Sequence, residues 1–134
     1  MPYITDERDI EFNLFEYLNM GELTERDRFK DHNVDLYKMV ASEGLKFCMN
    51  EFDPIYQSGD REGCELKDGV VRVPKGYKEA YKKTAENGFL AVDIPTTYGG
   101  QGLPIMLNTL LFEHFAGSNI CMALYIGLTR GSGF

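Results

Sequence analysis

A glycine-rich corner is the first stretch of this sequence whose residue types could do chemistry. Tyr98-Gly99-Gly100-Gln101-Gly102 stands just before an apolar segment, and backbone N–H groups at the start of a helix can bind phosphate. The dinucleotide pattern fails, however, because the third glycine position counted from Gly100 holds Ile105, and no Lys-Ser or Lys-Thr pair completes a P-loop. A tight structural corner is therefore favoured over a phosphate site.

The adjacent pair Glu113-His114 is the second candidate, because both side chains can bind a metal ion. Neighbouring residues on a helix point roughly 100° apart, so the two do not chelate one ion in the usual i, i+4 arrangement. Neither H-E-x-x-H nor its inverse occurs. We expect His114 to be a histidine at the edge of the core, and His32, at a helix start, to face solvent.

An acidic segment is the third candidate and suggests calcium, which binds through oxygen ligands. It consists of Asp53, Asp60, Glu62 and Glu65. Their spacing lacks the alternate ligands and the twelfth-position Glu of an EF-hand, so a solvated, turn-forming loop is favoured. With two histidines, neither beside a turn that bears a nucleophile, no Ser-His-Asp or Cys-His arrangement is indicated. We therefore assign no catalytic residue and no metal ligand.

The composition restricts the class of protein. A chain of 134 residues, 43% of them hydrophobic, has the length and material of one domain with a core. A net charge of −7 and a pI near 4.8, with no basic stripe, argue against a nucleic-acid partner. The cysteines Cys48, Cys64 and Cys121 form no C-x-x-C pair, which indicates a reducing compartment. Since no secretory signal is visible, we expect a soluble cytoplasmic protein.

The apolar stretch Leu103–Leu128 is long enough to suggest a membrane helix. Asn108, Glu113 and His114 interrupt it, and so does the Gly117-Ser118-Asn119 break. Each charge in mid-span costs about 2.5–3.5 kcal/mol. We therefore expect no membrane span.

Helical periodicity dominates the elements that must position these residues. Thr5 or Asp6 can cap a first helix. The clearest helix covers about residues 33–52, where apolar residues recur three or four positions apart, and we expect Pro54 to close it. Residues 55–73 then form a loop with a small hairpin, because Asp68-Gly69 is the strongest two-residue hairpin signal.

Three more segments complete the predicted fold. A helix from Pro74 to Asn87 has an inward face of Tyr77, Tyr81 and Ala85. An extended link follows at residues 89–94, and a further helix begins at Pro104, the position a proline suits. Gly117-Ser118-Asn119 joins it to a final apolar helix. The sequence predicts a mostly α protein, a bundle of about six helices with a small hairpin insertion.

The final segment is apolar on every side. Ile120, Met122, Leu124, Ile126 and Leu128 spread around the helical wheel, whereas a surface helix needs an apolar stripe of only about 100°. We therefore expect this helix to have neighbours on more than one face. The sequence reads as part of a larger body, truncated at the carboxyl end.

Several spaced blocks, in order, carry a resemblance to one family. The corner Ile94-Pro-Thr-Thr-Tyr-Gly-Gly-Gln-Gly-Leu-Pro104 followed by the apolar helix resembles the amino-terminal helical domain of the flavin-dependent acyl-CoA dehydrogenases. Upstream, Ser58-Gly-Asp60, Asp68-Gly-Val-Val-Arg-Val-Pro74 and Gly76-Tyr-Lys-Glu-Ala-Tyr81 are similar to the subgroup with an extra amino-terminal segment. The resemblance covers nearly the whole chain. It implies a single all-α domain over residues 1–134, with residues 1–73 as extension and hairpin loop and residues 74–134 as the start of the dehydrogenase helical domain.

The resemblance also implies what the parent protein does. It would be an oxidoreductase that uses FAD for α,β-dehydrogenation of an acyl-CoA thioester, passes electrons to an electron-transfer flavoprotein and forms a homo-oligomer. In the family, the catalytic glutamate and most flavin contacts lie in later domains, so this chain alone is expected to be inactive and to contribute no catalytic base.

The same resemblance implies pocket-lining residues on the final helix. The family uses this helix to wall one side of the acyl chain, which makes Met122, Tyr125, Ile126 and Thr129 the candidates for substrate binding. Interhelical core packing is the competing interpretation for each of them. Tyr125 is bulky where many relatives carry a small or polar residue, so a long straight acyl chain would be shortened or diverted.

Two other functions stay open at this point. The chain can be a stand-alone helical interaction module that docks through its apolar final helix, or a small acyl-thioester binding protein without redox chemistry. As a piece of a larger body, the isolated chain would expose an apolar patch larger than the few hundred Å² usual for a monomer.

Overall fold

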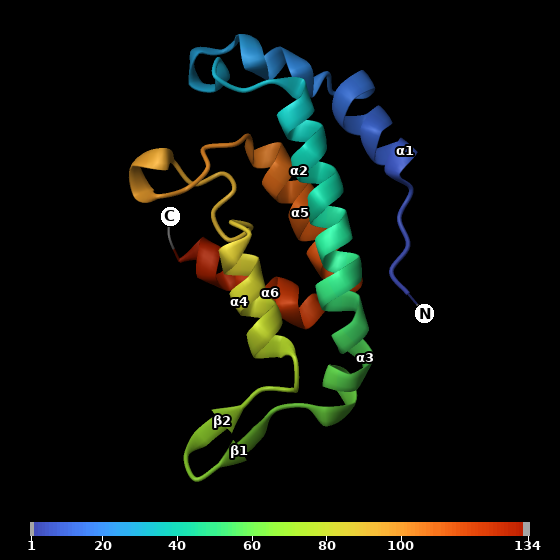
Figure 1. The fold of residues 1–134 in the computed structure, drawn as a ribbon, viewed down its shortest axis with the longest axis vertical. Coiled ribbons are helices and arrows are strands. Elements are labelled where there is room, and N and C mark those ends of the chain that lie inside the picture. The colour runs from blue at the N-terminus through green and yellow to red at the C-terminus, as the bar shows by residue number, and fades with distance from the viewer. Residues whose placement is uncertain (1, 133–134) are drawn as a thin grey trace.

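A long helical rod runs through the centre of the molecule (Figure 1). The computed structural model describes residues 2–132. In it, α2 (Val34–Phe47), a π-helical turn (Cys48–Phe52) and α3 (Asp53–Glu62) follow one another without a break. The rod is therefore longer than the helix predicted over residues 33–52.

Pro54 does not close this helix, contrary to the prediction. It lies in the first turn of α3, directly after the π-helical turn, and the rod continues through it. The chain leaves the rod at Gly63, whose positive φ of +65° is a conformation that glycine adopts without strain. The predicted loop over residues 55–73 is thus shortened by most of α3, and Ser58-Gly-Asp60 is helical.

The amino-terminal segment lies beside the upper part of the rod (Figure 1). Its helix α1 (Glu7–Glu11) begins at Asp6, one of the two predicted caps, whose Oδ1 accepts hydrogen bonds from the N–H groups of Arg8 at 2.9 Å and Asp9 at 3.3 Å. Short helical turns then lead to α2 at Phe12–Tyr17, Met20–Glu25 and Asp27–Phe29.

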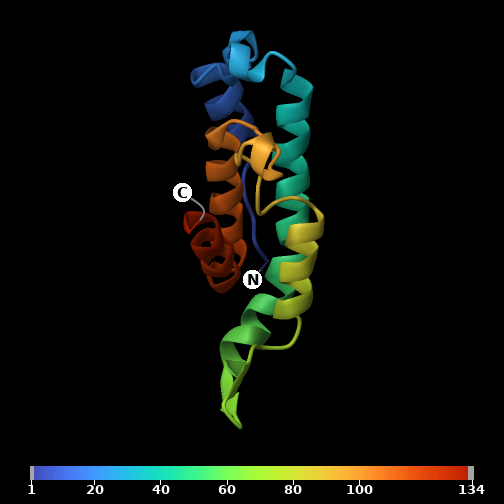
Figure 2. The same ribbon diagram turned by 90° about the vertical axis from the view of Figure 1, so that its left-hand side faces the viewer.

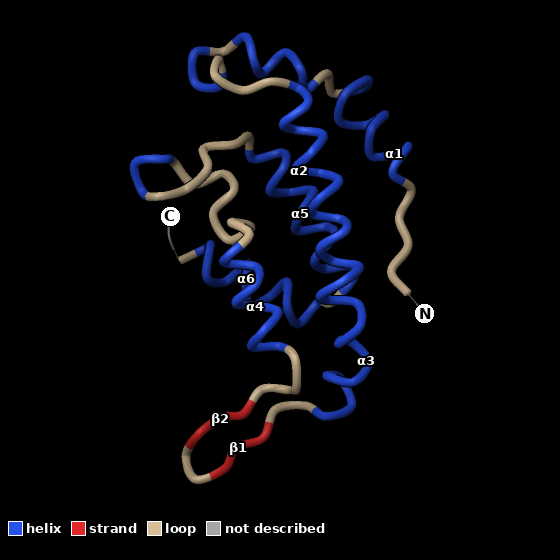
Figure 3. The backbone as a smooth tube through the Cα atoms, in the orientation of Figure 1, coloured by secondary structure: helices blue, strands red, loops and turns tan. Residues whose placement is uncertain are grey.

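The predicted hairpin is present and projects from one end of the helical body (Figure 3). Its strands are β1 (Glu65–Lys67) and β2 (Val70–Arg72), paired antiparallel. Asp68 and Gly69 form the turn with φ values of +52° and +76°, the two left-handed conformations that a type I′ turn requires.

Helix α4 (Tyr77–Glu86) returns the chain to the body. Its buried residues are Tyr77, Ala80 and Thr84, while Ala85 is exposed, so the predicted inward position of Ala85 was wrong. The reason is the spacing, because each four-residue step rotates about 40° around an α-helix, whereas the buried face follows Tyr77 at alternating three- and four-residue steps. The link over residues 89–94 forms consecutive turns instead of an extended segment.

The last two helices form the second layer of the body. Figure 2 shows α5 (Ile105–Ser118) and α6 (Ile120–Gly131) on one side and the rod with α4 on the other. Gly44 of α2 allows the layers to approach closely, because a Cβ at this position would collide with the side chain of Leu111. The two helices α5 and α6 are separated by a single residue, Asn119.

An aromatic cluster fills the core between the layers. The rings of Phe47, Phe52, Phe89 and Phe115 meet edge to face with centroid separations of 5.1 to 6.3 Å, a favourable arrangement for aromatic pairs. The described residues hold six α-helices and one small hairpin, so the predicted fold class is confirmed. Within residues 2–132, no helix has both the length and the apolar character that crossing a membrane requires.

Candidate functional site

The backbone N–H groups of the glycine corner are hydrogen-bonded to nearby carbonyl groups of the chain. Six consecutive N–H groups, those of residues 98 to 103, donate to carbonyl groups between residues 91 and 96 at 2.9 to 3.2 Å. A side chain at Gly100 would collide with the carbonyl of Ile94. Because none of these six N–H groups is left to point at an anion, the corner is the tight structural turn that the sequence favoured, and it offers no phosphate cradle.

His114 lies in the core beside α1 rather than at its edge. Its side chain is 1% exposed, and its Nδ1 lies 3.1 Å from the hydroxyl of Tyr3. Burial lowers the pKa of His114 below its ordinary value of 6.5, although the charge of Glu7 opposes the shift. Its neighbour Glu113 is exposed. Among residues 2–132, no three acidic, histidine or cysteine side chains gather in a way that could hold a metal ion.

The other titratable groups noted in the sequence have structural roles. His32 does not face solvent as predicted, because a short turn packs it half-buried against Phe29 and places its Nδ1 3.3 Å from the hydroxyl of Tyr37. In the acidic segment, Asp53 accepts a hydrogen bond from the N–H of Tyr3 at 2.9 Å. Burial raises the pKa of the Cys48 thiol to about 12, so this cysteine stays protonated at neutral pH.

A groove of about 310 Å³ lies between α4 and α6 and contains two of the predicted pocket residues. Its lining consists of Val73, Tyr77, Lys78, Tyr81, Tyr125 and Thr129. Tyr125 is 41% exposed, and burial raises its pKa, with Cys64 contributing, so its hydroxyl is neutral near pH 7. We call this feature the tyrosine groove.

One wall of the tyrosine groove is fixed by hydroxyl contacts. The Thr129 hydroxyl donates to the backbone carbonyl of Tyr125 at 2.8 Å. Its oxygen lies 3.3 Å from the Tyr81 hydroxyl, which must then be the donor, because the Thr129 proton is already used. This contact holds α4 against α6 at the mouth of the groove.

The other two predicted pocket residues point elsewhere. Ile126 is 4% exposed and borders a second groove of about 390 Å³ between α5 and α6, which also includes Phe112, Leu124 and Leu128. Met122 is fully buried in the core and lines neither groove. The structure therefore brings together Tyr125 and Thr129, four residues apart, but not all four candidates.

A buried asparagine positions α6 and one groove residue, and the sequence analysis identified it only as part of a joint. Asn119 is 1% exposed. Its Oδ1 accepts a hydrogen bond from the N–H of Met122 at 3.2 Å and so caps α6. Its Nδ2 donates to the carbonyl of Phe52 at 3.2 Å, and its amide lies 3.4 Å from the hydroxyl of Tyr77. The α5–α6 joint, the π-helical turn and the tyrosine groove thus meet at one side chain.

An ion pair fixes the other end of α6. The Nε of Arg130 donates to Oδ1 of Asp93 at 2.9 Å, and its Nη2 donates to Oδ2, so the pair is bidentate. The carboxylate is almost fully buried, with 6% of its side chain exposed against 22% for Arg130. Asp93 raises the pKa of Arg130 through this hydrogen bond. The clamp holds the last turn of α6 against the loop that precedes the glycine corner.

Chemically, this arrangement can accommodate an apolar ligand in an open groove. The tyrosine groove offers aromatic walls, the hydroxyl of Tyr125 and a cation, Lys78. The backbone N–H groups of residues 98–103 are already paired with carbonyl groups, so they are not available to the phosphates of a nucleotide cofactor. The main feature of the site is the tyrosine groove.

Comparison with known proteins identifies the family of the chain. The family model for the amino-terminal domain of acyl-CoA dehydrogenases matches residues 35–133. The chain is 27% identical over 132 residues to a 3-methylmercaptopropionyl-CoA dehydrogenase of Ruegeria pomeroyi, covering 98% of this chain and 22% of the relative. It is 28% identical over 134 residues to a broad-specificity linear acyl-CoA dehydrogenase of Mycobacterium tuberculosis, covering 98% and 21%.

A third relative is a butyryl-CoA dehydrogenase of Syntrophomonas wolfei, with 25% identity over 134 residues that cover 97% of this chain and 22% of the relative. The chain thus spans about a fifth of the length of the curated relatives it matches.

Proposed function

The chain belongs to the acyl-CoA dehydrogenase family as an amino-terminal helical domain, and from this premise we propose that it walls one side of the flavin and acyl pocket of a parent enzyme. The parent reaction is α,β-dehydrogenation of an acyl-CoA thioester with FAD as cofactor. On this proposal the domain is inactive alone, because the family resemblance implies a catalytic glutamate in a later domain.

The tyrosine groove is the observation that carries the proposal. Its volume of about 310 Å³ falls at the lower end of the range for small-molecule sites, about 300–1,000 Å³. An acyl chain needs apolar walls, which Val73 and the three tyrosine rings supply, and Thr129 and Lys78 add polar groups at defined places. We therefore assign Tyr125 and Thr129 to the acyl wall.

We propose a different, supporting role for Ile126 and Met122. Their side chains are 4% and 0% exposed and line no part of the tyrosine groove, so their contact with an acyl chain in that groove would require α6 to shift. We propose that they support the wall by packing α6 onto the core rather than by touching substrate.

The glycine corner does not fit the phosphates of FAD. Every backbone N–H group from residue 98 to 103 already has a carbonyl partner, and an N–H that turned to a ligand would first have to lose that partner. We propose that the parent holds the flavin phosphates outside this chain and assign no step of the reaction to residues 2–132. The electron-transfer flavoprotein, the homo-oligomer and the cytoplasmic location are proposals that rest on the family alone.

Chain-length preference of the intact parent enzyme tests the role of Tyr125. In the variant Tyr125→Ala, the ratio of kcat/KM for an eight-carbon to a four-carbon straight acyl-CoA should rise about tenfold or more, because one methylene in an apolar pocket changes kcat/KM by about 10- to 200-fold. Tyr56→Ala is the matched control, since Tyr56 on α3 is 40% exposed against 41% for Tyr125 and borders none of the grooves described above. An unchanged ratio in a folded Tyr125→Ala enzyme would contradict the acyl-wall assignment.

The stand-alone interaction module is the second candidate, and the outer face of α6 favours it. Ile120, Leu124 and Leu128 are 44%, 52% and 72% exposed on this helix, an apolar surface that suits a protein partner. The intact mass of the native gene product separates the two functions. A mass several times 15.2 kDa supports the dehydrogenase domain, whereas a product that ends at Phe134 supports the module.

A further inference from the structure

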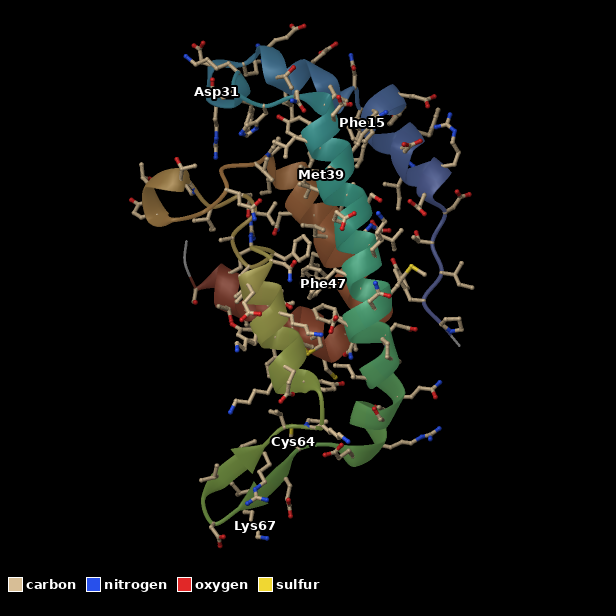
Figure 4. All side chains as sticks on the ribbon, in the orientation of Figure 1. Phe15, Asp31, Met39, Phe47, Cys64 and Lys67 are labelled. Carbon is tan, nitrogen blue, oxygen red and sulfur yellow. The ribbon has the colours of Figure 1, made fainter. Side chains whose placement is uncertain are left out.

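The β1–β2 hairpin presents apolar side chains to solvent. It projects from the end of the helical body, with Lys67 near its tip (Figures 1 and 4). Leu66, Val70 and Val71 are 72%, 62% and 62% exposed. An isolated two-stranded hairpin is marginally stable in water, and three or more strands with an apolar face are needed for independent stability. The hairpin therefore has the character of a docking element.

The alternation of the strands sorts the hairpin side chains onto two faces. Leu66 and Val71 are direct partners in the antiparallel register, so they share one face. Glu65 and Lys67 lie on the opposite face, and Glu65 is opposite Arg72. In a hairpin with a two-residue turn the residues flanking the turn are hydrogen-bonded to each other, so the N–H and C=O of Leu66 point to the open edge of β1.

We propose that this edge pairs with the same edge of a second copy of the chain, β1 antiparallel to β1 about a twofold axis at Leu66. In this register Leu66 faces Leu66 of the second copy. Glu65 of each copy faces Lys67 of the other, which gives two opposite-charge pairs across the new strand interface. The sequence Glu65-Leu66-Lys67 is self-complementary in charge when it is reversed against itself, as a twofold interface requires.

The other edge lacks this property. In a β2–β2 pair about Val71, Arg72 would face the uncharged Val70 of the second copy, and no opposite charges would meet. In the β1–β1 arrangement, by contrast, Glu65 lies between Arg72 of its own hairpin and Lys67 of the second copy. The four strands together gather Leu66 and Val71 of both copies on one apolar face.

The size of this contact sets its strength. Three-residue strands bury far less than the roughly 1,000 Å² of a specific, stable interface. The pairing is therefore weak and concentration-dependent when it acts alone, and it adds to any larger contact between subunits. It does not depend on the proposed dehydrogenase function, because the hairpin strands border neither the tyrosine groove nor the groove between α5 and α6.

Charge reversal in the intact polypeptide tests the pairing. Lys67→Glu turns both cross-copy pairs into like-charge pairs and faces only Val70 within its own hairpin. The double variant E65K/R72E does the same with positive charge, and it keeps an opposite-charge pair inside the hairpin. Each variant alone should dimerise about tenfold more weakly than the wild type. A mixture of the two should associate, because positions 65 and 67 are both acidic in the first variant and both basic in the second.

Two measurements test whether these variants weaken the pairing. Sedimentation velocity over a range of concentrations gives the association, and amide hydrogen exchange of the β1 peptide reports whether the outward N–H of Leu66 is covered. Lys30→Glu, an exposed site with the same charge change as Lys67→Glu, is the control and should behave as the wild type. The Leu66 amide should be protected in the wild type and in the mixture, and about tenfold less protected in each variant alone.

Two results would overturn the proposal. A Leu66 amide that exchanges as freely in the wild type as in Lys67→Glu would show that nothing covers the edge. Protection that is equal in the wild type, in each variant and in the mixture would show that a different segment or partner covers it.

Discussion

Replacing Asn119 with alanine is the sharpest test of how α6 is held in place. The substitution removes the cap of α6 at Met122 N, the donor to the carbonyl of Phe52 and the contact with the Tyr77 hydroxyl. All of these contacts are buried. Water therefore cannot replace the lost partners without opening the joint between α5 and α6.

The expected loss follows from counting these contacts. Losing a side-chain cap costs about 1 kcal/mol, and leaving a buried carbonyl without its donor costs about 1–3 kcal/mol. Because the Tyr77 hydroxyl is held at a long 3.4 Å, we add nothing for it. Asn119→Ala should therefore lower the free energy of unfolding by about 2–4 kcal/mol, a large part of the roughly 5–15 kcal/mol of a typical domain.

The assay is urea unfolding of the chain followed by circular dichroism at 222 nm. Asn33→Ala is the matched control, because the Oδ1 of Asn33 caps α2 by accepting from the N–H of Leu36 at 2.8 Å in an exposed setting. That variant should lose only the cap, about 1 kcal/mol. If Asn119→Ala lost no more stability than Asn33→Ala, the argument that buried contacts at the joint hold α6 would be refuted.

Two further predictions concern buried charge. The folded pKa of His114 lies below its unfolded value of 6.5, so the unfolded state binds more protons as the pH falls through 6.5. Stability that is present above pH 6.5 is therefore lost below it, by up to about 1.4 kcal/mol per pH unit. Urea unfolding at pH 7.5 and 5.5 should show this loss in the wild type and not in His114→Gln. Arg130→Ala should lower the free energy of unfolding by about 3 kcal/mol, the low end for a buried pair because Arg130 is partly exposed, since it leaves the carboxylate of Asp93 buried without this partner. In the same assay Lys46→Ala, which breaks an exposed pair with Glu43, should leave stability unchanged within error.

The elements that the sequence predicted well are those with local causes. Asp68-Gly69 determines a turn within two residues, and Asp6 caps α1 through bonds to residues two and three positions on. Pro54 failed as a stop signal because a proline can be accommodated inside a helix at an irregular turn, and here the π-helical turn lies directly before it. Ala85 was assigned inward by two successive four-residue steps from Tyr77, which together rotate about 80° away from the buried face.

The Asn119 contacts were beyond local pattern reasoning. Its partners Phe52 and Tyr77 lie 67 and 42 residues away along the chain, so no spacing rule connects them. The available signal was an asparagine directly before an apolar helix, which is the signature of a cap. The sequence located the joint, but the hydrogen bonds that make it rigid follow only from the packing of the two layers.

The orientation of α6 explains why only two of the four predicted pocket residues line the tyrosine groove. Their i, i+3, i+4, i+7 spacing places them on one helical face. Met122 and Ile126 lie on the side of that face that packs onto the core, and Tyr125 lies at its other edge. Asn119 and Arg130 fix the two ends of the helix, so this rotation is set. Within that orientation only Tyr125 and Thr129 of the four line the tyrosine groove. Under the proposed acyl-wall role, Tyr125, as the larger of the two side chains, is therefore the one that would limit the length of a bound acyl chain.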